Sequence, residues 1–322
     1  MAKKNRLILV IISATLIFSL VSSLLYFYTD WLFFVETGFT SVFITTLTAR
    51  IGVGLLFGLL MLVIVLVNLF IANRFPVSHT GVFIPGAGYR IGSEDTARLS
   101  IPLSLLAGFV LAFLAGKWGA VQWEDVLLYS NRLPVGTMDP VNGKDIGFYL
   151  FTLPFLESLS DFAGFALPVI MIAVVLLYFL RGAITLSEMG ITVDAKARKH
   201  LAVLVGICSL AVAAGFYLDG FRLLLSGSSA FHGAGYADVH ARLPTYRLLT
   251  FLTPVAGWML AAGLWKGGLR AALMPVALLF VVYIGGVKLY PSLLQKFKVA
   301  PNELALETPY IESNIKFTRL GF

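Results

Sequence analysis

Seven stretches of apolar residues constrain the fold of this chain more than any other feature. A helix needs roughly 20 apolar residues to cross a hydrocarbon core of about 30 Å. Because lipid offers no hydrogen-bond partners to backbone N–H and C=O groups, each stretch is expected to form an α-helix. The predicted spans cover residues 7–28, 51–71, 101–116, 162–180, 201–218, 248–264 and 271–287.

The composition indicates the same class of protein. Of the 322 residues, 58% are hydrophobic and 13% are charged, whereas soluble domains carry about 25% charged residues. The predicted fold class is therefore an all-α integral membrane protein, with seven transmembrane helices and an extracytoplasmic cap of loops and short helices. The net charge of +7 comes from basic residues at the ends of the apolar runs. This pattern sets topology and excludes nucleic acid as a partner.

The distribution of Lys and Arg predicts how the helices are oriented. If the N-terminus lies in the cytoplasm, the inner segments hold twelve basic and four acidic residues. The outer segments up to the last span then hold seven basic and ten acidic residues. The first apolar run is longer than the core of a signal peptide, about 7–15 residues, so it is expected to remain as a span. The chain is predicted to have its N-terminus inside and its C-terminus outside.

A change in composition near residue 287 predicts two parts. Residues 1–287 are expected to form the seven-span membrane domain, in which Gly267 and Gly268 supply a tight turn between the last two spans. Residues 288–322 are polar and contain Pro291, Pro301 and Pro309. They are expected outside the membrane, as the start of an extracytoplasmic segment or domain.

Two outer segments hold the residues that a site would use. Residues 118–161 alternate aromatic and acidic side chains, and Asp139-Pro140 is expected to start a turn. Residues 219–247 are rich in glycine and serine before a short charged stretch. The candidate cap or ligand-binding residues are Asp139, Asp145, Tyr149, Asp238, His240 and Arg242.

Catalysis and metal binding are the weaker interpretations of these residues. An acid–base pair such as Asp139 and Asp145 needs a set separation and shifted pKa values, and sequence supplies neither. His232, Asp238 and His240 are of types that bind zinc or manganese, but their spacing matches no recognised metal site. No catalytic residue, metal or cofactor is therefore predicted, and a loop held by hydrogen bonds is the favoured interpretation.

The interiors of the predicted spans are uncharged. None of them contains Asp, Glu, Lys, Arg or His, which argues against a proton-coupled carrier, a pump or a charged-filter channel. Pro254 and Pro275 lie inside the sixth and seventh spans. They keep open a transporter with broken helices, although kinks in packed helices are the favoured interpretation.

Small residues four positions apart occur in two spans. Gly54 and Gly58 lie in the second span, and Gly257 and Ala261 lie in the sixth. Such pairs let helix backbones approach closely. Packing within the chain is the favoured interpretation, and a homo-oligomer is the alternative.

Motifs along the whole chain carry a family resemblance. The last outer segment contains Pro301-Asn302-Glu303, Glu307, Pro309-Tyr310-Ile311, Asn314-Ile315 and Thr318-Arg319. Earlier outer segments contain Trp31, Phe34, Glu36 and Gly38, then Asp139-Pro140, Asp145 and Phe148-Tyr149-x-Phe151-x-Leu153-Pro154-Phe155, then Tyr236-x-Asp238 and Ala241-x-Leu243-Pro244. In this order the motifs resemble the uncharacterised protein family UPF0182, a family of multi-pass bacterial membrane proteins.

The resemblance implies an architecture and no activity. Members of this family are similar in having seven N-terminal spans followed by a large extracytoplasmic domain, and no catalytic residues come with the likeness. The chain departs from the pattern at Asn142, Ala237 and Gly321. It also stops where family members continue.

The function that these features favour is a non-enzymatic anchor or scaffold in the bacterial inner membrane. It would support an extracytoplasmic domain or a separate extracytoplasmic protein. The alternatives are a transporter or lipid-handling protein, and the membrane part of an envelope enzyme. The expected partners are the lipid bilayer and the extracytoplasmic domain or protein, with a second copy of the chain as a further alternative.

Overall fold

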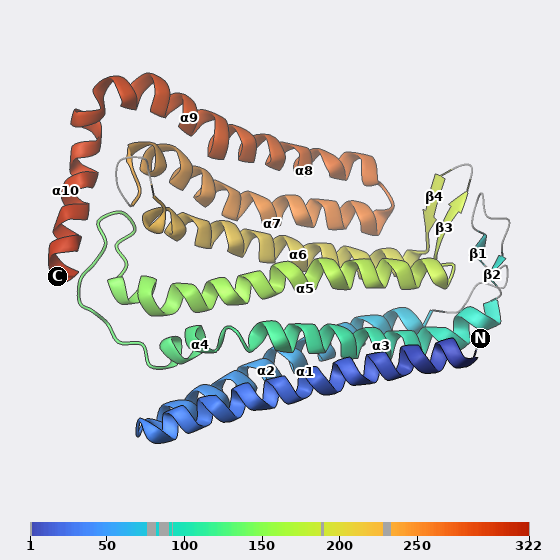
Figure 1. Cartoon of the computed structure of the whole chain (residues 1–322). Coiled ribbons are helices and arrows are strands. Elements are labelled where there is room, and N and C mark those ends of the chain that lie inside the picture. Colours follow the sequence, from blue (N-terminus) through green and yellow to red (C-terminus); the bar gives the residue numbers. More distant parts are fainter. Residues whose placement is uncertain are drawn as a thin grey trace.

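Long helices that run side by side in alternating directions make up the structure, a computed structural model (Figure 1). It describes residues 2–75, 82–83, 90–91, 93–187, 190–227 and 233–321. Seven helices in this described part are long and apolar enough to cross a membrane, so the predicted fold class is confirmed. The main helices are α1 (Ala2–Glu36), α2 (Thr40–Asn73), α3 (Ser93–Gly119), α5 (Leu153–Leu180), α6 (Ala195–Arg222), α7 (Leu243–Lys266) and α8 (Leu269–Tyr283).

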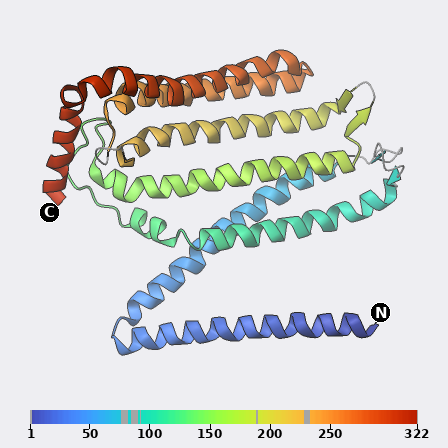
Figure 2. The ribbon, with the colours of Figure 1, turned by 45° about the horizontal axis from the view of Figure 1, so that its top comes forward.

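The two ends of the bundle differ in their connections (Figures 1 and 2). One end, the cap end, holds α4 (Trp123–Ser130), the loop 131–147, residues 223–227 and 233–242, and α10 (Glu303–Gly321). The other end, the hairpin end, holds the N-terminus and two antiparallel strand pairs. The pairs are β1 (Val82–Phe83) with β2 (Arg90–Ile91), and β3 (Ile184–Ser187) with β4 (Gly190–Val193).

Tight turns allow the helices to extend beyond the predicted spans. Only residues 37–39 separate α1 from α2, with Gly38 at a φ of +77°, where a residue with a Cβ is strained. Gly267, at a φ of +81°, ends α7 in the left-handed conformation, and α8 begins at Leu269. The glycine turn that the sequence predicts between the last two spans is therefore confirmed.

Stripes of apolar residues at helical spacing form the core between α2, α5 and α6. On α2 the buried stripe is Val53, Phe57, Met61, Val65 and Leu69, one residue every fourth position, so it forms a single ridge along the helix. Phe57 also meets Trp118 of α3 and Phe162 of α5, with ring centroids 5.3 Å and 5.0 Å away. This aromatic cluster joins three helices near the cap end.

Glycines bring α2 and α3 into backbone contact. A Cβ added at Gly54 would lie 2.9 Å from the carbonyl oxygen of Gly116, and one at Gly58 would lie 3.1 Å from that of Ala112. A Cβ at Gly257 of α7 would overlap Ser209 of α6. Both small-residue motifs therefore use their first glycine for packing within the chain.

The helix that contains the predicted seventh span continues beyond residue 287. Helical backbone continues from α8 through η4 (Ile284–Leu289), α9 (Tyr290–Leu294), η5 (Gln295–Val299) and η6 (Ala300–Asn302) into α10. The elements η4 and η5 are turns of π-helix, which accommodate an extra residue inside a helix. The helix then bends, and α10 runs across the cap end of the bundle (Figures 1 and 2). Residues 288–321 are thus helical and packed against the cap.

A half-buried arginine joins three helices at the hairpin end. The guanidinium of Arg181, just after α5, donates to the carbonyl oxygen of Phe75 at 2.9 and 2.6 Å. It also donates to Oδ1 of Asn73 at 3.0 Å and to Oγ of Ser100 at 2.9 Å. The carbonyl groups at the end of a helix lack hydrogen-bond partners within it. Arg181 therefore supplies the hydrogen bonds for the carbonyl group of Phe75, just after α2.

Replacing Gly54 by leucine should destabilise the α2–α3 pair, because the new Cβ would press on the backbone of Gly116. Overpacking of this kind costs about 1–3 kcal/mol, so the thermal midpoint of the purified chain in detergent should fall. Gly52→Leu is the matched control, since a Cβ at Gly52 on the same helix meets nothing within 4 Å. Equal midpoints for the two variants would contradict the close contact.

Candidate functional site

Asp145 binds backbone N–H groups in the first part and at the end of the cap loop, which is the loop 131–147. Its Oδ1 accepts hydrogen bonds from the N–H groups of Val135 and Gly147 at 3.0 and 2.7 Å, and its Oδ2 accepts one from Gly136 at 2.7 Å. These N–H groups, that of Val135 first, hold the pKa of the Asp145 carboxyl below its ordinary value of 3.8, because they stabilise the charged form. The carboxylate acts as an internal acceptor for loop backbone.

Asp139 organises the middle of the loop and ties it to η1 (Phe148–Thr152), the turn of π-helix that leads into α5. It is buried, with 7% of its surface exposed. Its Oδ1 accepts from the N–H groups of Val141 and Asn142, and its Oδ2 accepts from that of Lys144. Its Oδ2 also accepts from the hydroxyl of Tyr149 at 2.9 Å. The predicted turn at Asp139-Pro140 is therefore confirmed, since an Asp side chain that binds N–H groups two and three residues on defines such a turn.

A second carboxylate cluster joins residues 233–242 to the end of the chain. The Asp238 carboxylate accepts from the N–H of Gly235 at 3.2 Å and pairs with the Arg242 guanidinium. Arg242 also donates to the carbonyl oxygen of Val287 at 3.4 Å. Glu307 of α10, 5% exposed, accepts from the N–H of Tyr236 at 3.0 Å. Two carboxylates from distant parts of the chain therefore bind the same short segment.

His240 lies in an aromatic stack at the surface of this cluster. Its ring is 4.1 Å from that of Tyr236, centroid to centroid, and nearly parallel to it. Lys298 donates to the Tyr236 hydroxyl at 2.8 Å, and the Tyr310 hydroxyl lies 3.4 Å from Nδ1 of His240. The imidazole thus packs among ring systems instead of meeting other metal-ligating side chains.

The cavity at the cap end collects some of the candidate residues and leaves others out. It has a volume of about 570 Å³ and lies between the cap loop, residues 224–225 and 233–239, and α10. Asp139 and Tyr149 line it, together with Tyr310 and Phe317 of α10. Asp145, Asp238, His240 and Arg242 do not line it. A hydrogen bond of 3.2 Å from Arg247 to the Asn142 side chain links α7 to the cap loop.

The arrangement favours packing and binding over acid–base chemistry. The two aspartates of the cap loop accept hydrogen bonds mainly from backbone N–H groups, and each belongs to a different part of the loop. Among the residues that the structure describes, no group of three His, Cys, Asp or Glu side chains could hold a metal ion. His232, one member of the metal interpretation, lies outside the described residues.

Two groups of residues were not among the sequence candidates. Glu307 has no local signal for its role, because its partner Tyr236 is 71 positions away. The charged cluster of Glu157, Asp219 and Arg222 does have one. Asp219 and Arg222 are three positions apart on α6 and form an ion pair at 3.0 Å, and such a spacing places two side chains on one helix face. In the sequence, the charges of these three residues contribute only to the predicted orientation of the helices.

Comparison with known proteins identifies the family. The sequence model of the uncharacterised protein family (UPF0182) matches residues 7–322. This chain belongs to UPF0182. A UPF0182 protein of Geotalea uraniireducens is 58% identical over 320 residues, which cover 99% of this chain and 36% of the relative. UPF0182 protein GSU2333 of Geobacter sulfurreducens is 53% identical over 322 residues, with the same coverage of 99% and 36%.

Relatives with lower sequence identity also match the chain. A UPF0182 protein of Desulforamulus reducens is 30% identical over 331 residues, covering 98% of this chain and 35% of the relative. No solved structure matches the chain. The chain spans about a third of the length of the curated UPF0182 relatives that it matches.

Replacing Asp139 by asparagine should loosen the cap, because one acceptor oxygen becomes a donor that faces N–H groups. A buried donor or acceptor without a hydrogen-bond partner lowers the free energy of unfolding by about 1–3 kcal/mol. Protection of the Val141, Asn142 and Lys144 amides from hydrogen exchange should fall accordingly. Glu124→Gln, at an exposed acid of α4, is the control and should leave protection unchanged. Full protection in Asp139→Asn would assign Asp139 a role other than holding the loop.

Acidification should release the loop through Asp145. Its folded pKa is below its ordinary value, so its contribution to stability is complete above the unfolded pKa and is lost as the pH falls through the folded pKa. Protection factors of the Val135, Gly136 and Gly147 amides should stay level from pH 7 down to about pH 4 and drop below it. In Asp145→Asn they should be low at neutral pH and insensitive to acid. A variant with the wild-type pH profile would refute this assignment.

Proposed function

We propose that this chain is the membrane-spanning part of a UPF0182 protein of the bacterial inner membrane, with its N-terminus in the cytoplasm and its C-terminus outside. Its role is to anchor and support an extracytoplasmic domain or protein, which contacts the cap end. The observation that carries the proposal is the attachment of α10 to the cap, where the buried Glu307 accepts a hydrogen bond from the N–H of Tyr236 at 3.0 Å.

The charges at the two ends of the bundle support this orientation. Cytoplasmic segments of membrane proteins are rich in Lys and Arg, and the hairpin end carries such residues. The basic residues of that end with described positions include Arg74, Arg181, Lys196, Arg198, Lys199 and Lys266. At the cap end, basic residues such as Arg132, Lys144 and Arg222 are accompanied by acids, namely Asp139, Asp145, Glu157, Asp161, Asp219 and Asp238.

The surface of α10 supports a role as a connection. One side is fastened to the cap through Glu307, whereas Leu304 and Leu320 are 87% and 61% exposed. The outward side of α10 is therefore open to contact with further protein. The curated relatives have nearly two-thirds of their length outside the match. We assign that remaining part to the outer side of the membrane, in contact with the cap.

The alternatives have less support. A transporter with broken helices would interrupt α7 near Pro254, but α7 runs as one helix from Leu243 to Lys266. Half-helices that point at a substrate are the usual design of such sites. An envelope enzyme would need its reacting groups from elsewhere, since Asp139 and Asp145 are engaged with loop N–H groups. An anchor requires neither feature.

Reporter fusions test the orientation. A reporter placed after Arg270 should behave as cytoplasmic, because the α7–α8 turn lies at the hairpin end. The same reporter after Lys298 should behave as external. Paired fluorescent and phosphatase reporters at each site provide the control for expression. The opposite pattern at both sites would exclude the proposed topology.

External protease tests the anchor role in the longer UPF0182 protein of Geotalea uraniireducens, used at full length. Spheroplasts should lose the portion outside the match and keep a membrane-bound fragment close in size to this chain of 35.1 kDa. Lysed spheroplasts serve as the control for cleavage on the inner side. A full-length protein that resists external protease and is cut only after lysis would place the remaining portion inside and contradict the anchor role.

A further inference from the structure

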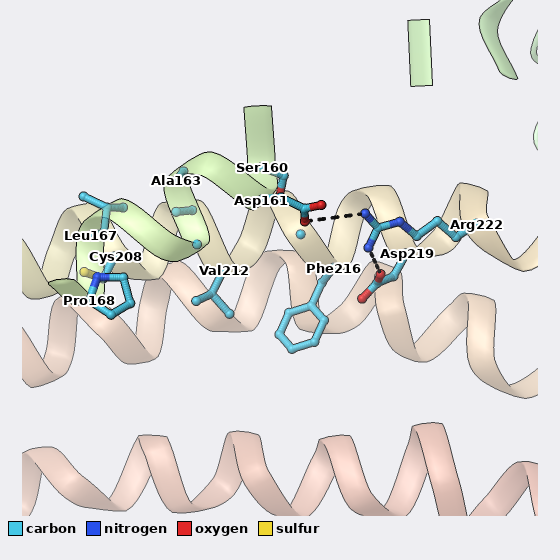
Figure 3. Close-up of a pocket in the computed structure, with 13 residues that line it drawn as sticks. Ser160, Asp161, Ala163, Leu167, Pro168, Cys208, Val212, Phe216, Asp219 and Arg222 are labelled. Carbon is cyan, nitrogen blue, oxygen red and sulfur yellow. Dashed lines mark hydrogen bonds and ion pairs between the residues drawn. The ribbon is translucent and has the colours of Figure 1, made fainter. Parts of the chain in front are cut away.

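A pocket of about 440 Å³ lies between α5 and α6, away from the cap cavity (Figure 3). At one end Leu167, Pro168 and Cys208 line it, and at the other end lie the charged Asp161 and Arg222. From Cys208 to Arg222 the pocket follows α6 for roughly 20 Å, at about 1.5 Å per residue. It is therefore elongated and apolar along most of its length, with one charged end.

Glycines keep this pocket open. A Cβ added at Gly164 of α5 would meet no atom within 4 Å, and one at Gly215 of α6 would come only within 3.8 Å of Ser160 Oγ. These positions contrast with Gly54, whose added Cβ would strike the next helix. At Gly164 and Gly215 the missing side chains leave empty space beside the helices instead of close helix contact.

Arg222, at the charged end, meets three carboxylates, of which those of Asp161 and Asp219 line the pocket. Arg222 pairs with Glu157 at 2.7 Å and with Asp219 at 3.0 Å. Asp161 is more distant, at 3.9 Å, and its side chain is 67% exposed, whereas that of Arg222 is 40% exposed. The cluster has more negative than positive charge, and its exposed carboxylate is the one least engaged by the arginine. A cationic group would be attracted to this end of the pocket.

We propose that the α5–α6 pocket binds a membrane phospholipid with a zwitterionic, amine-bearing headgroup. One acyl chain lies along the apolar part, beside Gly164 and Gly215. The headgroup ammonium pairs with Asp161, and the phosphate approaches the partly exposed guanidinium of Arg222. An anionic lipid without an amine would bring its phosphate to the same three carboxylates with no ammonium to offset their repulsion.

The order of groups along the pocket matches the order in such a lipid. The charged cluster is at the cap end of α5 and α6, and the apolar lining continues from it toward the middle of the bundle. Phospholipids place their headgroup at the membrane surface and their chains toward its centre. The inference rests on the membrane location given under the proposed function, and it concerns a lipid of the outer leaflet.

Native mass spectrometry of the purified chain tests the proposal, with equal amounts of phosphatidylethanolamine and phosphatidylglycerol that share the same acyl chains. The wild-type chain should retain phosphatidylethanolamine in preference to phosphatidylglycerol. In Asp161→Asn this preference should shrink toward equal binding, by a few-fold, because an exposed ion pair contributes little. Total lipid binding should remain in this variant.

Filling the pocket tests the acyl-chain part. Gly164→Leu should lower phosphatidylethanolamine binding by about tenfold or more, which corresponds to about 1.4 kcal/mol. The variant should still fold, because the added side chain enters open space and leucine favours helix over glycine. Gly52→Leu, on α2 and equally free of neighbours within 4 Å, is the matched control and should bind like the wild type. Thermal midpoints confirm folding for each variant.

Two results would overturn the proposal. Equal retention of both lipids by the wild-type chain would remove the headgroup assignment, and unchanged binding by Gly164→Leu would remove the pocket as the site. Binding that falls equally in Gly164→Leu and Gly52→Leu would indicate nonspecific lipid around the helices. The reporter fusions after Arg270 and Lys298 report separately on membrane topology, so failure of the lipid site and failure of the proposed anchor are distinguishable.

Discussion

Backbone N–H and C=O groups at the ends of helices and in the connecting loops need hydrogen-bond partners outside the helix. This constraint shapes both ends of the bundle. Within the helices the backbone satisfies itself, which is the requirement for crossing lipid. At the cap end, carboxylates take over as acceptors: Asp145 and Asp139 bind N–H groups of one loop, and Glu307 binds that of Tyr236. At the hairpin end the Arg181 guanidinium donates to the free carbonyl of Phe75. In these connections the charged side chains are therefore structural, whereas glycines make the α1–α2 and α7–α8 turns.

The sequence predicts the parts of this fold that depend on local pattern. The length of each apolar run predicts a helix, and the pair Gly267-Gly268 predicts the turn between α7 and α8. The helix ends are less predictable, because charged residues such as Glu36 and Arg50 remain in helices once these extend past the apolar run. Hydropathy marks where a helix is apolar and does not mark where its hydrogen bonding stops. The same limit explains why the polar residues 288–321 gave no sign that the helix continues through them.

Only the part of the candidate site around Asp139 was predictable from the sequence. Asp139 binds N–H groups two and three residues on, so Asp139-Pro140 carries its turn in the sequence itself. Glu307 and Tyr236 meet only because α10 bends back across the bundle, and no local pattern contains that bend. Glycines show a related limit. Gly54 and Gly164 are both helix-interior glycines in apolar runs, yet one touches a neighbouring backbone and the other borders open space. Only the position of the facing helix separates these two uses.

Whether an acid is available for a ligand depends on how many of its acceptor positions are filled. Asp139 is 7% exposed and receives hydrogen bonds from three N–H groups and a hydroxyl, so an added ligand would have to displace internal bonds. Asp161 is 67% exposed and meets a cation only at 3.9 Å. The acids that the sequence marks most clearly are thus those that the fold already uses. A ligand is better accommodated at the α5–α6 pocket. There Arg222, which forms ion pairs, and Asp161, which is only weakly paired, border an apolar space that no side chain fills.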